Sequence, residues 1–288
     1  SAVDGDTVAI PAGTGYWEEK CMVTNKFIHI QGAGTNSTII VDELTPANRA
    51  AFDASIFNVR MTTPNANVFR ISNIQFQGGV TNTSSIGSGY FTIHTTTNVT
   101  GPHALWRLDH CYFNLPHGRC FWTFTYYGLI DNNTFIVTTS ISQFDGVRDN
   151  LWFDNSWTQD RYAGSTNMLY IENNFFSNTT GNTAAVVDGI AGSRYCLRFN
   201  TILNLSAHNH GTDSFKRLRS VRYMEIYGNT FSGTANSEYA ILIRGGSMLV
   251  FSNNCVGSGL GLFRSHYYRT SEPFSPWGQA NGTNSWDT

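Results

Sequence analysis

Charged residues are scarce in this chain. Only 13 % of its 288 residues are Asp, Glu, Lys or Arg, and the formal net charge at pH 7 is −2. Nucleic-acid binding needs a basic patch or stripe, so this charge balance gives no basis for it. Long apolar runs are missing as well, because no stretch approaches the roughly 20 apolar residues of a membrane-spanning helix. The sequence therefore predicts neither a nucleic-acid partner nor a membrane span.

Metal-ligand cysteine spacing and a leader segment are also absent. The chain has five cysteines, and no two of them form a CxxC pair. Cys111 and Cys120 can pair only if their coils are adjacent, and we favour small apolar cysteines buried in a core. No signal peptide is found and the first residue is Ser1, so we expect a chain processed or excised from something longer. Further domains beyond either end, and a homo-oligomer, both stay open.

Gly and aromatic residues are abundant, among frequent Asn, Thr and Ser, a mixture typical of short strands separated by polar turns. One pattern repeats along the chain: an apolar strand residue, a polar residue, a small polar turn residue that is usually Asn, and a second apolar or aromatic residue. When the turn residue is taken as the anchor, the spacings are 37, 22, 41, 27, 28 and 25 residues. The seven segments are RISNIQF (70–76), RLDHCYF (107–113), LIDNNTF (129–135), YIENNFF (170–176), LRFNTIL (197–203), EIYGNTF (225–231) and VFSNNCV (250–256).

This repeat predicts a solenoid. A strand of three to five residues cannot bury its apolar face alone, but stacked coils pair each strand with the same strand one coil along. Coils of about 22–28 residues with Asn turns indicate an all-β fold, a right-handed parallel β-helix with long loop insertions. We expect one domain over 1–267, with insertions near 45–55, where a short helix is expected, and 138–167. Residues 268–288 lose the repeat and are expected to form an irregular cap or linker.

The repeat also predicts which side chains point outward. If the strand residue two before the anchor points inward, the residue directly before the anchor points outward. Asp109, Asp131 and Glu172 then lie on neighbouring coils, where three carboxylates repel unless a cation or a shared proton relieves them. Ca²⁺ bound by these three residues is one hypothesis, and a pair of acid/base carboxylates is another. The alternative is that they bond turn amides or basic neighbours such as Arg107. The complete predicted row is Ser72, Asp109, Asp131, Glu172, Phe199, Tyr227 and Ser252.

Basic residues concentrate in one short segment. Lys216, Arg217, Arg219 and Arg222 lie within seven positions of a chain that is otherwise sparsely charged. With Met224 and Ile226 inward, the alternation places Arg217, Arg219, Tyr223, Glu225 and Tyr227 on the outer face. Such arginines suit an acidic sugar, or else an internal network with Asp188, Asp213 and Glu225. The residues expected to contact a substrate are His210, Lys216, Tyr227 and three aromatic residues of the long insertion, Trp152, Trp157 and Tyr162.

At this point the chain resembles the pectin-lyase-like group of secreted β-helix proteins, over about residues 5–260. The resemblance rests on DGDTVAIPAG (4–13), on the repeated coils, on WRLDHCYF (106–113) and on RLRSVRYMEIYGNTF (217–231). It implies a secreted or cell-surface protein in which an arginine removes the proton α to a uronate carboxylate and Ca²⁺ on nearby acids neutralises that carboxylate. Carried over, the base is Arg217, Arg219 or Arg222, and the cation lies near Asp109, Asp131 or Glu172.

The sequence departs from the family pattern in the arginine segment. Arg219 stands where the family has a Pro, and the distance from the arginines to the final Asn is about two residues shorter. The segment DGIAGSRYCLRFN (188–200) is closer to a branch of bacterial secreted β-helix proteins. Two hypotheses follow. One is an extracellular polysaccharide lyase acting on an acidic, uronate-containing polysaccharide, with a glycoside hydrolase as a variant. The other is a non-catalytic β-helix adhesin, spike or surface module that binds glycans.

Overall fold

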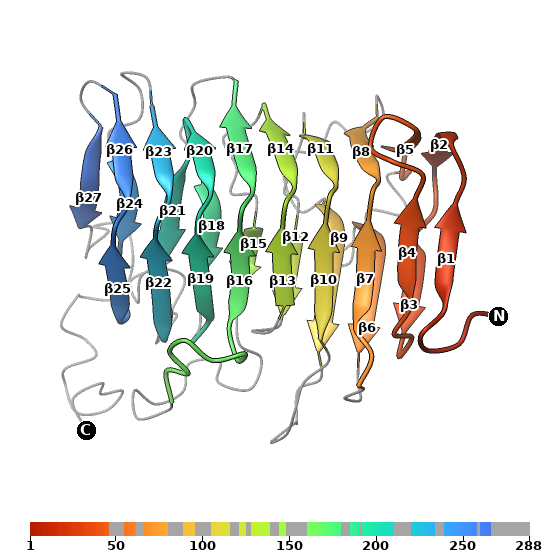
Figure 1. Ribbon diagram of the computed structural model, residues 1–288, viewed down its shortest axis with the longest axis horizontal. Helices are drawn as coiled ribbons and strands as arrows, with labels where there is room; N and C mark the ends of the chain where they lie inside the picture. Colours follow the sequence, from red (N-terminus) through yellow and green to blue (C-terminus); the bar gives the residue numbers. More distant parts are fainter. Residues whose placement is uncertain are drawn as a thin grey trace.

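The computed structural model describes residues 1–45, 55–61, 66–79, 89–95, 105–115, 121–124, 128–138, 144–147, 160–179, 185–189, 192–209, 220–233, 239–257 and 260–265. These residues form three parallel sheets of nine strands each, and the strands of each sheet lie side by side along the long axis of the molecule (Figure 1). Every third strand of the chain belongs to the same sheet, so three consecutive strands make one coil.

Sheet A contains β1 (Thr7–Ile10), β4 (His29–Gly32), β7 (Phe69–Ser72), β10 (Trp106–Asp109), β13 (Gly128–Asp131), β16 (Leu169–Glu172), β19 (Arg194–Arg198), β22 (Tyr223–Tyr227) and β25 (Met248–Phe251). Sheet B contains β2 (Gly13–Trp17), β5 (Thr38–Asp42), β8 (Gln75–Gly78), β11 (Tyr112–Leu115), β14 (Thr134–Val137), β17 (Phe175–Asn178), β20 (Thr201–Leu203), β23 (Thr230–Ser232) and β26 (Asn254–Val256). Sheet C contains β3 (Cys21–Thr24), β6 (Ser55–Met61), β9 (Gly89–Thr95), β12 (Phe121–Phe124), β15 (Phe144–Val147), β18 (Ala185–Gly189), β21 (Ser206–Asn209), β24 (Tyr239–Ile243) and β27 (Gly261–Ser265).

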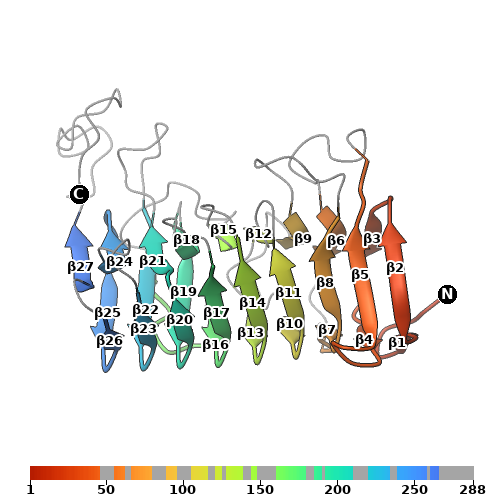
Figure 2. The same cartoon turned by 90° about the horizontal axis from the view of Figure 1, so that it is seen from above.

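The winding is right-handed. The chain runs up the front of the molecule along sheet A, turns toward the back along sheet B and returns along sheet C, while it advances from the N-terminal end to the C-terminal end (Figures 1 and 2). This is the handedness that parallel crossover connections almost always adopt. The predicted all-β, right-handed parallel β-helix is therefore confirmed.

The core is filled by equivalent residues of successive coils. In sheet B, four phenylalanine rings stack nearly parallel, with centroids 5.0, 4.6 and 4.6 Å apart. In sheet A, the residues predicted to point inward from the repeat are all buried. Burying side chains in this way supplies the apolar area that no single coil offers alone. The four rings are Phe76, Phe113, Phe135 and Phe176, and the inward sheet A residues are Ile71, Leu108, Ile130, Ile171 and Ile226.

A ladder of five asparagines, of which all but the last are buried, stabilises the bend between sheets A and B. Each amide nitrogen except the last donates to the amide oxygen of the next asparagine, over 3.0–3.1 Å. Each nitrogen also donates to backbone carbonyls of its own coil, the preceding coil or both. The ladder thus provides partners for backbone groups that a sharp bend leaves without sheet partners. Its members are Asn133, Asn174, Asn200, Asn229 and Asn253.

The bend itself has a second required position, directly before the ladder. Residues there adopt a left-handed backbone, with φ of 54° at Asn132, 54° at Asn173, 57° at Phe199 and 52° at Ser252. Asn tolerates this conformation well, which explains the Asn of the repeat. In LRFNTIL and VFSNNCV, however, the Asn used as anchor is the ladder Asn, one residue further on. The predicted outward row was therefore wrong by one residue in these two coils.

The long spacings of the repeat are explained by the pairing of strands. β7 pairs directly with β10, and β13 with β16, so spacings of 37 and 41 residues each correspond to one coil with long connections. Residues 144–147, within the insertion expected at 138–167, form β15 of the coil itself. Most of the insertion expected at 45–55, including the short helix predicted there, and the tail at 268–288 lie outside the described residues.

Candidate functional site

The outer face of sheet A carries the strongest concentration of polar chemistry in the described part of the chain. Strand pairing defines two rows of outward residues on it, each with one residue per coil. The C-terminal row, at the ends of the strands, is Gln31, Ser72, Asp109, Asp131, Glu172, Arg198, Tyr227 and Phe251. The N-terminal row, two residues earlier, is His29, Arg70, Arg107, Leu129, Tyr170, Cys196, Glu225 and Leu249. Arg198 and Phe251 replace the predicted Phe199 and Ser252.

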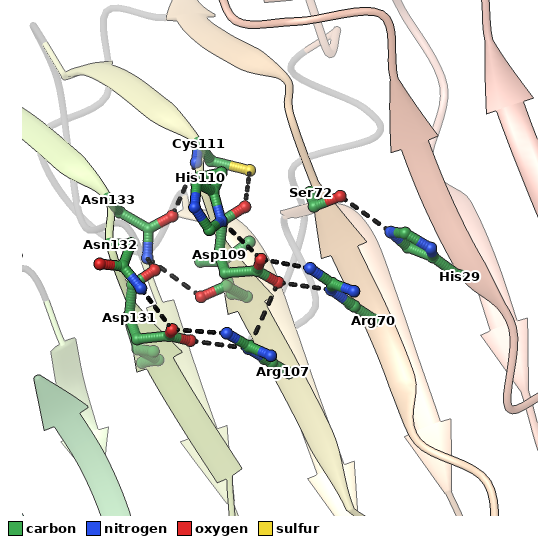
Figure 3. Close-up of polar contacts among 12 residues, drawn as sticks. His29, Arg70, Ser72, Arg107, Asp109, His110, Cys111, Asp131, Asn132 and Asn133 are labelled. Carbon is green, nitrogen blue, oxygen red and sulfur yellow. Dashed lines mark hydrogen bonds and ion pairs between the residues drawn. The ribbon is translucent and has the colours of Figure 1, made fainter.

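Side chains of the N-terminal row reach diagonally to the C-terminal row of the next coil (Figure 3). Arg70 on β7 donates two hydrogen bonds to Asp109 on β10, over 2.7 and 2.5 Å. Arg107 on β10 repeats this with Asp131 on β13, over 2.9 and 2.7 Å. His29 is hydrogen-bonded to Ser72 in the same sense. The diagonal arises because outward side chains lean along the strand and neighbouring strands lie about 4.8 Å apart.

The two carboxylates lie behind the guanidinium groups. The side chain of Asp109 is 0 % exposed and that of Asp131 is 5 % exposed, whereas Arg70 and Arg107 are 35 % and 34 % exposed. His110, which is 55 % exposed, also contacts Asp109 through Nδ1 at 2.7 Å. The groups in contact with solvent are therefore the side chains of Arg70, Arg107 and His110, and not the two carboxylates. Within the described residues, Nη1 of Arg70 and of Arg107 has no protein partner, since both carboxylates are bound through Nε and Nη2.

The electrostatics keep these ion pairs charged. Burial alone raises the pKa of Asp109, but the hydrogen bonds from Arg70 and His110 and the charge of Arg107 outweigh it, so the pKa is lowered. The hydrogen bond to Asp109 raises the pKa of Arg70, and the one to Asp131 raises the pKa of Arg107. Bidentate arginine–carboxylate pairs of this kind fix the guanidinium plane. The face therefore presents two guanidinium groups in fixed orientations, each paired with a carboxylate behind it.

The diagonal pattern changes at Leu129, whose side chain cannot donate to Glu172. Glu172 is instead bound from the other side, by Nε of Arg198 at 2.5 Å. Arg198 also donates to the hydroxyl of Tyr227 at 2.8 Å, and its guanidinium lies 4.8 Å from the ring centre of Tyr170. Burial alone lowers the pKa of Arg198, but the bonds to Tyr227 and Glu172 raise it overall. Arg198 was not among the predicted site residues.

Beyond Arg198 the outer face becomes aromatic. The rings of Tyr227 and Phe251 stack with centroids 4.6 Å apart and planes 12° apart, and Phe199 meets Tyr227 edge-on at 5.5 Å. Phe199 is 52 % exposed and Phe251 is 45 % exposed. Gly228, with φ of 65°, is needed beside them because a Cβ there would approach the Phe199 ring to 2.6 Å.

The segment 160–168 packs over the start of β16, β19 and β22. The backbone nitrogen of Gly164 donates to Glu225 at 3.0 Å, and the hydroxyl of Tyr170 donates to the carbonyl of Ser165 at 2.6 Å. Tyr162, a predicted substrate contact, lies under the buried guanidinium of Arg194 at 5.1 Å. These contacts enclose a small apolar cluster outside the main core, made of Met168, Cys196 and Tyr223 with Tyr170 and Tyr227.

Of the three arginines predicted as bases, only Arg222 lies in the described part of the chain. It is half-buried directly before β22, and its backbone nitrogen donates to the carbonyl of Ser193. Burial, followed by the charge of Arg161, lowers the pKa of Arg222. That is the direction a basic role requires. The other candidates, Arg217, Arg219, Lys216, His210, Trp152 and Trp157, lie outside the described residues.

The predicted calcium ligands are neighbours, as expected, but they do not form a cation site. Asp109 pairs in register with Asp131, and Asp131 with Glu172. An arginine binds each of the three carboxylates, which is the alternative that named Arg107 as a partner. Within the described ranges, no group of three His, Cys, Asp or Glu side chains is placed to hold a metal ion. These residues therefore do not fit calcium, and we derive no chemical step through it.

Arg70 and Arg198 were missed in the sequence for different reasons. Arg70 precedes Ser72 just as Arg107 precedes Asp109, so the shared Arg-x-(Ser/Asp) spacing of RISN and RLDH was an available signal. Arg198 was missed because the Asn of LRFN was aligned with the wrong bend position. The diagonal reach of each arginine to the next coil has no signal within a single coil, since it depends on register.

Comparison with known proteins does not assign the chain to a family. No family model and no curated protein matches the sequence. Among solved structures, the Azotobacter vinelandii mannuronan C-5 epimerase AlgE4 A-module matches 93 % of this chain and 91 % of its own, at 14 % identity and a TM-score of 0.29. A likeness this distant carries no argument about activity. Within the described residues, no helix is long and apolar enough to cross a membrane. The β-helix assignment rests on the strand topology itself.

Proposed function

We propose that this protein engages an acidic polysaccharide along the outer face of sheet A. The observation that carries the proposal is the pair Arg70 and Arg107, whose partly exposed side chains cover buried carboxylates. Buried Asp109 and Asp131 orient the two cations without presenting negative charge to solvent. Uronate carboxylates match this arrangement, because a guanidinium fixed on one side still offers planar donors on the other.

The regular spacing of the coils favours a polymer over a single small anion. Arg70 and Arg107 occupy equivalent positions on paired strands, and His110 adds an exposed imidazole ring beside them. Successive coils lie about 4.8 Å apart, so the cations form a row along the solenoid axis. A chain with repeated carboxylates can contact several members of such a row at once, and simultaneous weak contacts give a higher overall affinity than any one of them alone. A polymer of this kind implies a secreted or cell-surface protein.

Lyase chemistry is the catalytic form of this proposal. A base removes the proton from the carbon next to the uronate carboxyl, the electron pair forms a carbon–carbon double bond, and the glycosidic oxygen leaves and takes up a proton. Arg222, whose pKa is lowered, is the described candidate for the base predicted at 217–222. It directly precedes β22, which lies four strands from the β10 strand of Arg107 in sheet A, or about 19 Å at ~4.8 Å per strand, so Arg70 and Arg107 would bind other uronates of the polymer than the one that loses its proton. The hydrolase variant is less well supported, because a general acid needs a raised pKa and Asp109 has a lowered one.

A non-catalytic glycan-binding module is the second candidate, favoured by a specific observation. The groups beside Arg198 are not poised to accept a proton near neutral pH. Burial raises the pKa of Tyr170 to about 12 and that of Cys196 to about 12, and it also raises the pKa of Tyr227. These side chains are therefore suited to shape and hydrogen bonding more than to base catalysis.

The test is a panel of uronate polymers with matched neutral polymers. Affinity electrophoresis measures binding, and absorbance near 235 nm follows unsaturated product, with and without EDTA. Retardation on uronate gels that weakens with salt is the expected result, and new absorbance assigns the lyase. EDTA-sensitive product would restore the calcium prediction. If no uronate polymer retards the protein or is cleaved, the proposal is wrong.

A further inference from the structure

The last two coils of sheet A present a surface unlike the rest of the face. In the C-terminal row, Ser72, Asp109, Asp131, Glu172 and Arg198 are followed by Tyr227 and Phe251. The two rings are stacked, and Phe199 is added from the adjoining bend. A row that is polar through six coils, from Gln31 to Arg198, thus ends in the rings of Tyr227 and Phe251, and Phe199 completes a cluster of three.

These rings are more exposed than structural packing requires. Phe199 and Phe251 are 52 % and 45 % exposed, while core phenylalanines of the same coils, such as Phe231, are 1 % exposed. Phe251 stacks on Tyr227 with one ring face, and its strand β25 is the last of sheet A. Within the described residues, no further strand covers the other face of the Phe251 ring. Solvent exposure of large apolar side chains in a cluster marks a contact surface.

The polar groups beside the rings restrict what this surface can contact. Arg198 lies 5.6 Å from the centre of the Phe199 ring and 6.0 Å from that of Tyr227. It holds the Tyr227 hydroxyl at 2.8 Å and uses Nε for Glu172. A guanidinium and a phenol at the border of aromatic rings suit a ligand with one apolar face and a polar rim. A pyranose ring has this character, because its axial C–H groups can meet the electron-rich ring face while its substituents hydrogen-bond at the edge.

We infer that Phe251, Tyr227 and Phe199 form a sugar-stacking subsite for one pyranose residue of the polysaccharide held by Arg70 and Arg107. This inference rests on the proposed function and specifies it. The occupant is argued from continuity, since the rings belong to the same outer face and the same row as the ion pairs. The face therefore has two parts, a cationic part over β7–β13 that selects acidic polymers and an aromatic part over β19–β25 that binds a ring.

The two parts differ in how they respond to salt, and this difference provides the test. Ionic contacts at the surface are screened as salt rises, whereas apolar stacking is not. We expect Phe251→Ala to weaken binding of the uronate polymer by about tenfold, the range of an aromatic contact plus its buried area. The loss should persist at high salt. Phe251→Trp should restore affinity, and Phe251→Leu, which keeps apolar area without a ring face, should not.

Phe263 provides the matched control. It is also a phenylalanine of the last coil and is 50 % exposed, but it lies on β27 of sheet C. Phe263→Ala should bind like the wild type, and circular dichroism of both alanine variants checks that the fold is intact. If Arg107→Gln weakens binding while Phe251→Ala equals Phe263→Ala, the stacking subsite is wrong and the proposed function stands. If the wild type binds no polymer, both are wrong.

Discussion

Replacement of Asn174 by alanine tests how the bends of the solenoid are stabilised. Its buried side chain donates to the carbonyls of Ile130 and Glu172 and to Oδ1 of Asn200, and it accepts from the backbone and amide nitrogens of Asn133. The substitution removes these five bonds and takes the side-chain partner from three backbone groups. At about 1 kcal/mol for each hydrogen bond, with Asn133 and Asn200 keeping other partners, we expect a loss of about 3–5 kcal/mol.

Equilibrium urea unfolding, followed by circular dichroism, measures this loss. Asn254→Ala is the matched control, because Asn254 is exposed on β26 and lies outside the ladder. Its free energy of unfolding should change by less than about 0.5 kcal/mol, as for an ordinary surface substitution. The ladder would then account for a large part of a total stability of about 5–15 kcal/mol. Equal urea midpoints for Asn174→Ala and Asn254→Ala would refute the assignment of the ladder as the stabilising element.

The ion pairs and thiols give three further expected outcomes. In a double-mutant cycle, Arg107→Gln should lower the free energy of unfolding of the wild type by about 1 kcal/mol or more beyond its effect on the Asp131→Asn variant. The reason is that Arg107→Gln leaves the buried carboxylate of Asp131 without its ion-pair partner only in the wild type. Additive effects of the two substitutions would argue against the ion pair. The lowered pKa of Asp109 contributes stability that is present above its unfolded pKa of about 4 and is lost as pH falls toward the lower folded value. Asp109→Asn should therefore flatten the acid limb of unfolding free energy against pH, and an unchanged limb would contradict this. Burial raises the pKa of Cys196 to about 12, so a thiol reagent at pH 8 should label this residue only after urea unfolds the chain. Mass spectrometry of the peptides measures the labelling, and labelled Cys196 in the folded protein would contradict the prediction.

The fold could be predicted because its determinants repeat within each coil. Alternation of inward and outward residues assigned Ile71, Leu108 and Ile130 to the core, and the structure confirms this. The repeated Asn had two separate causes, however, and the sequence pattern merged them. At the first bend position Asn is favoured because it tolerates the left-handed backbone, and at the next position Asn is required for the amide ladder. Where a phenylalanine occupies the left-handed position, as at Phe199, alignment on Asn places the register one residue out.

The site was harder to predict because its contacts join different coils. The proximity of Asp109 and Asp131 could be predicted from the repeat, but the neutralisation of their charges by arginines could not. It depends on Arg70 and Arg107, which lie 39 and 24 residues before their carboxylate partners. Only the pairing of β7, β10 and β13 brings these residues within hydrogen-bond distance. A row of acids thus suggested a cation site, although arginines of neighbouring coils already pair with each carboxylate.

The most direct measurement is the affinity of a uronate polymer for the double variant Arg107→Gln/Asp131→Asn, as a function of salt. This variant removes one guanidinium and its buried partner together, so the net charge stays at its original value and no carboxylate is stranded. Arg264→Gln, which removes an arginine from β27 of sheet C, is the control. The account predicts weaker binding and a shallower salt dependence for the double variant, and wild-type behaviour for the control. Wild-type affinity and salt dependence in the double variant would contradict it.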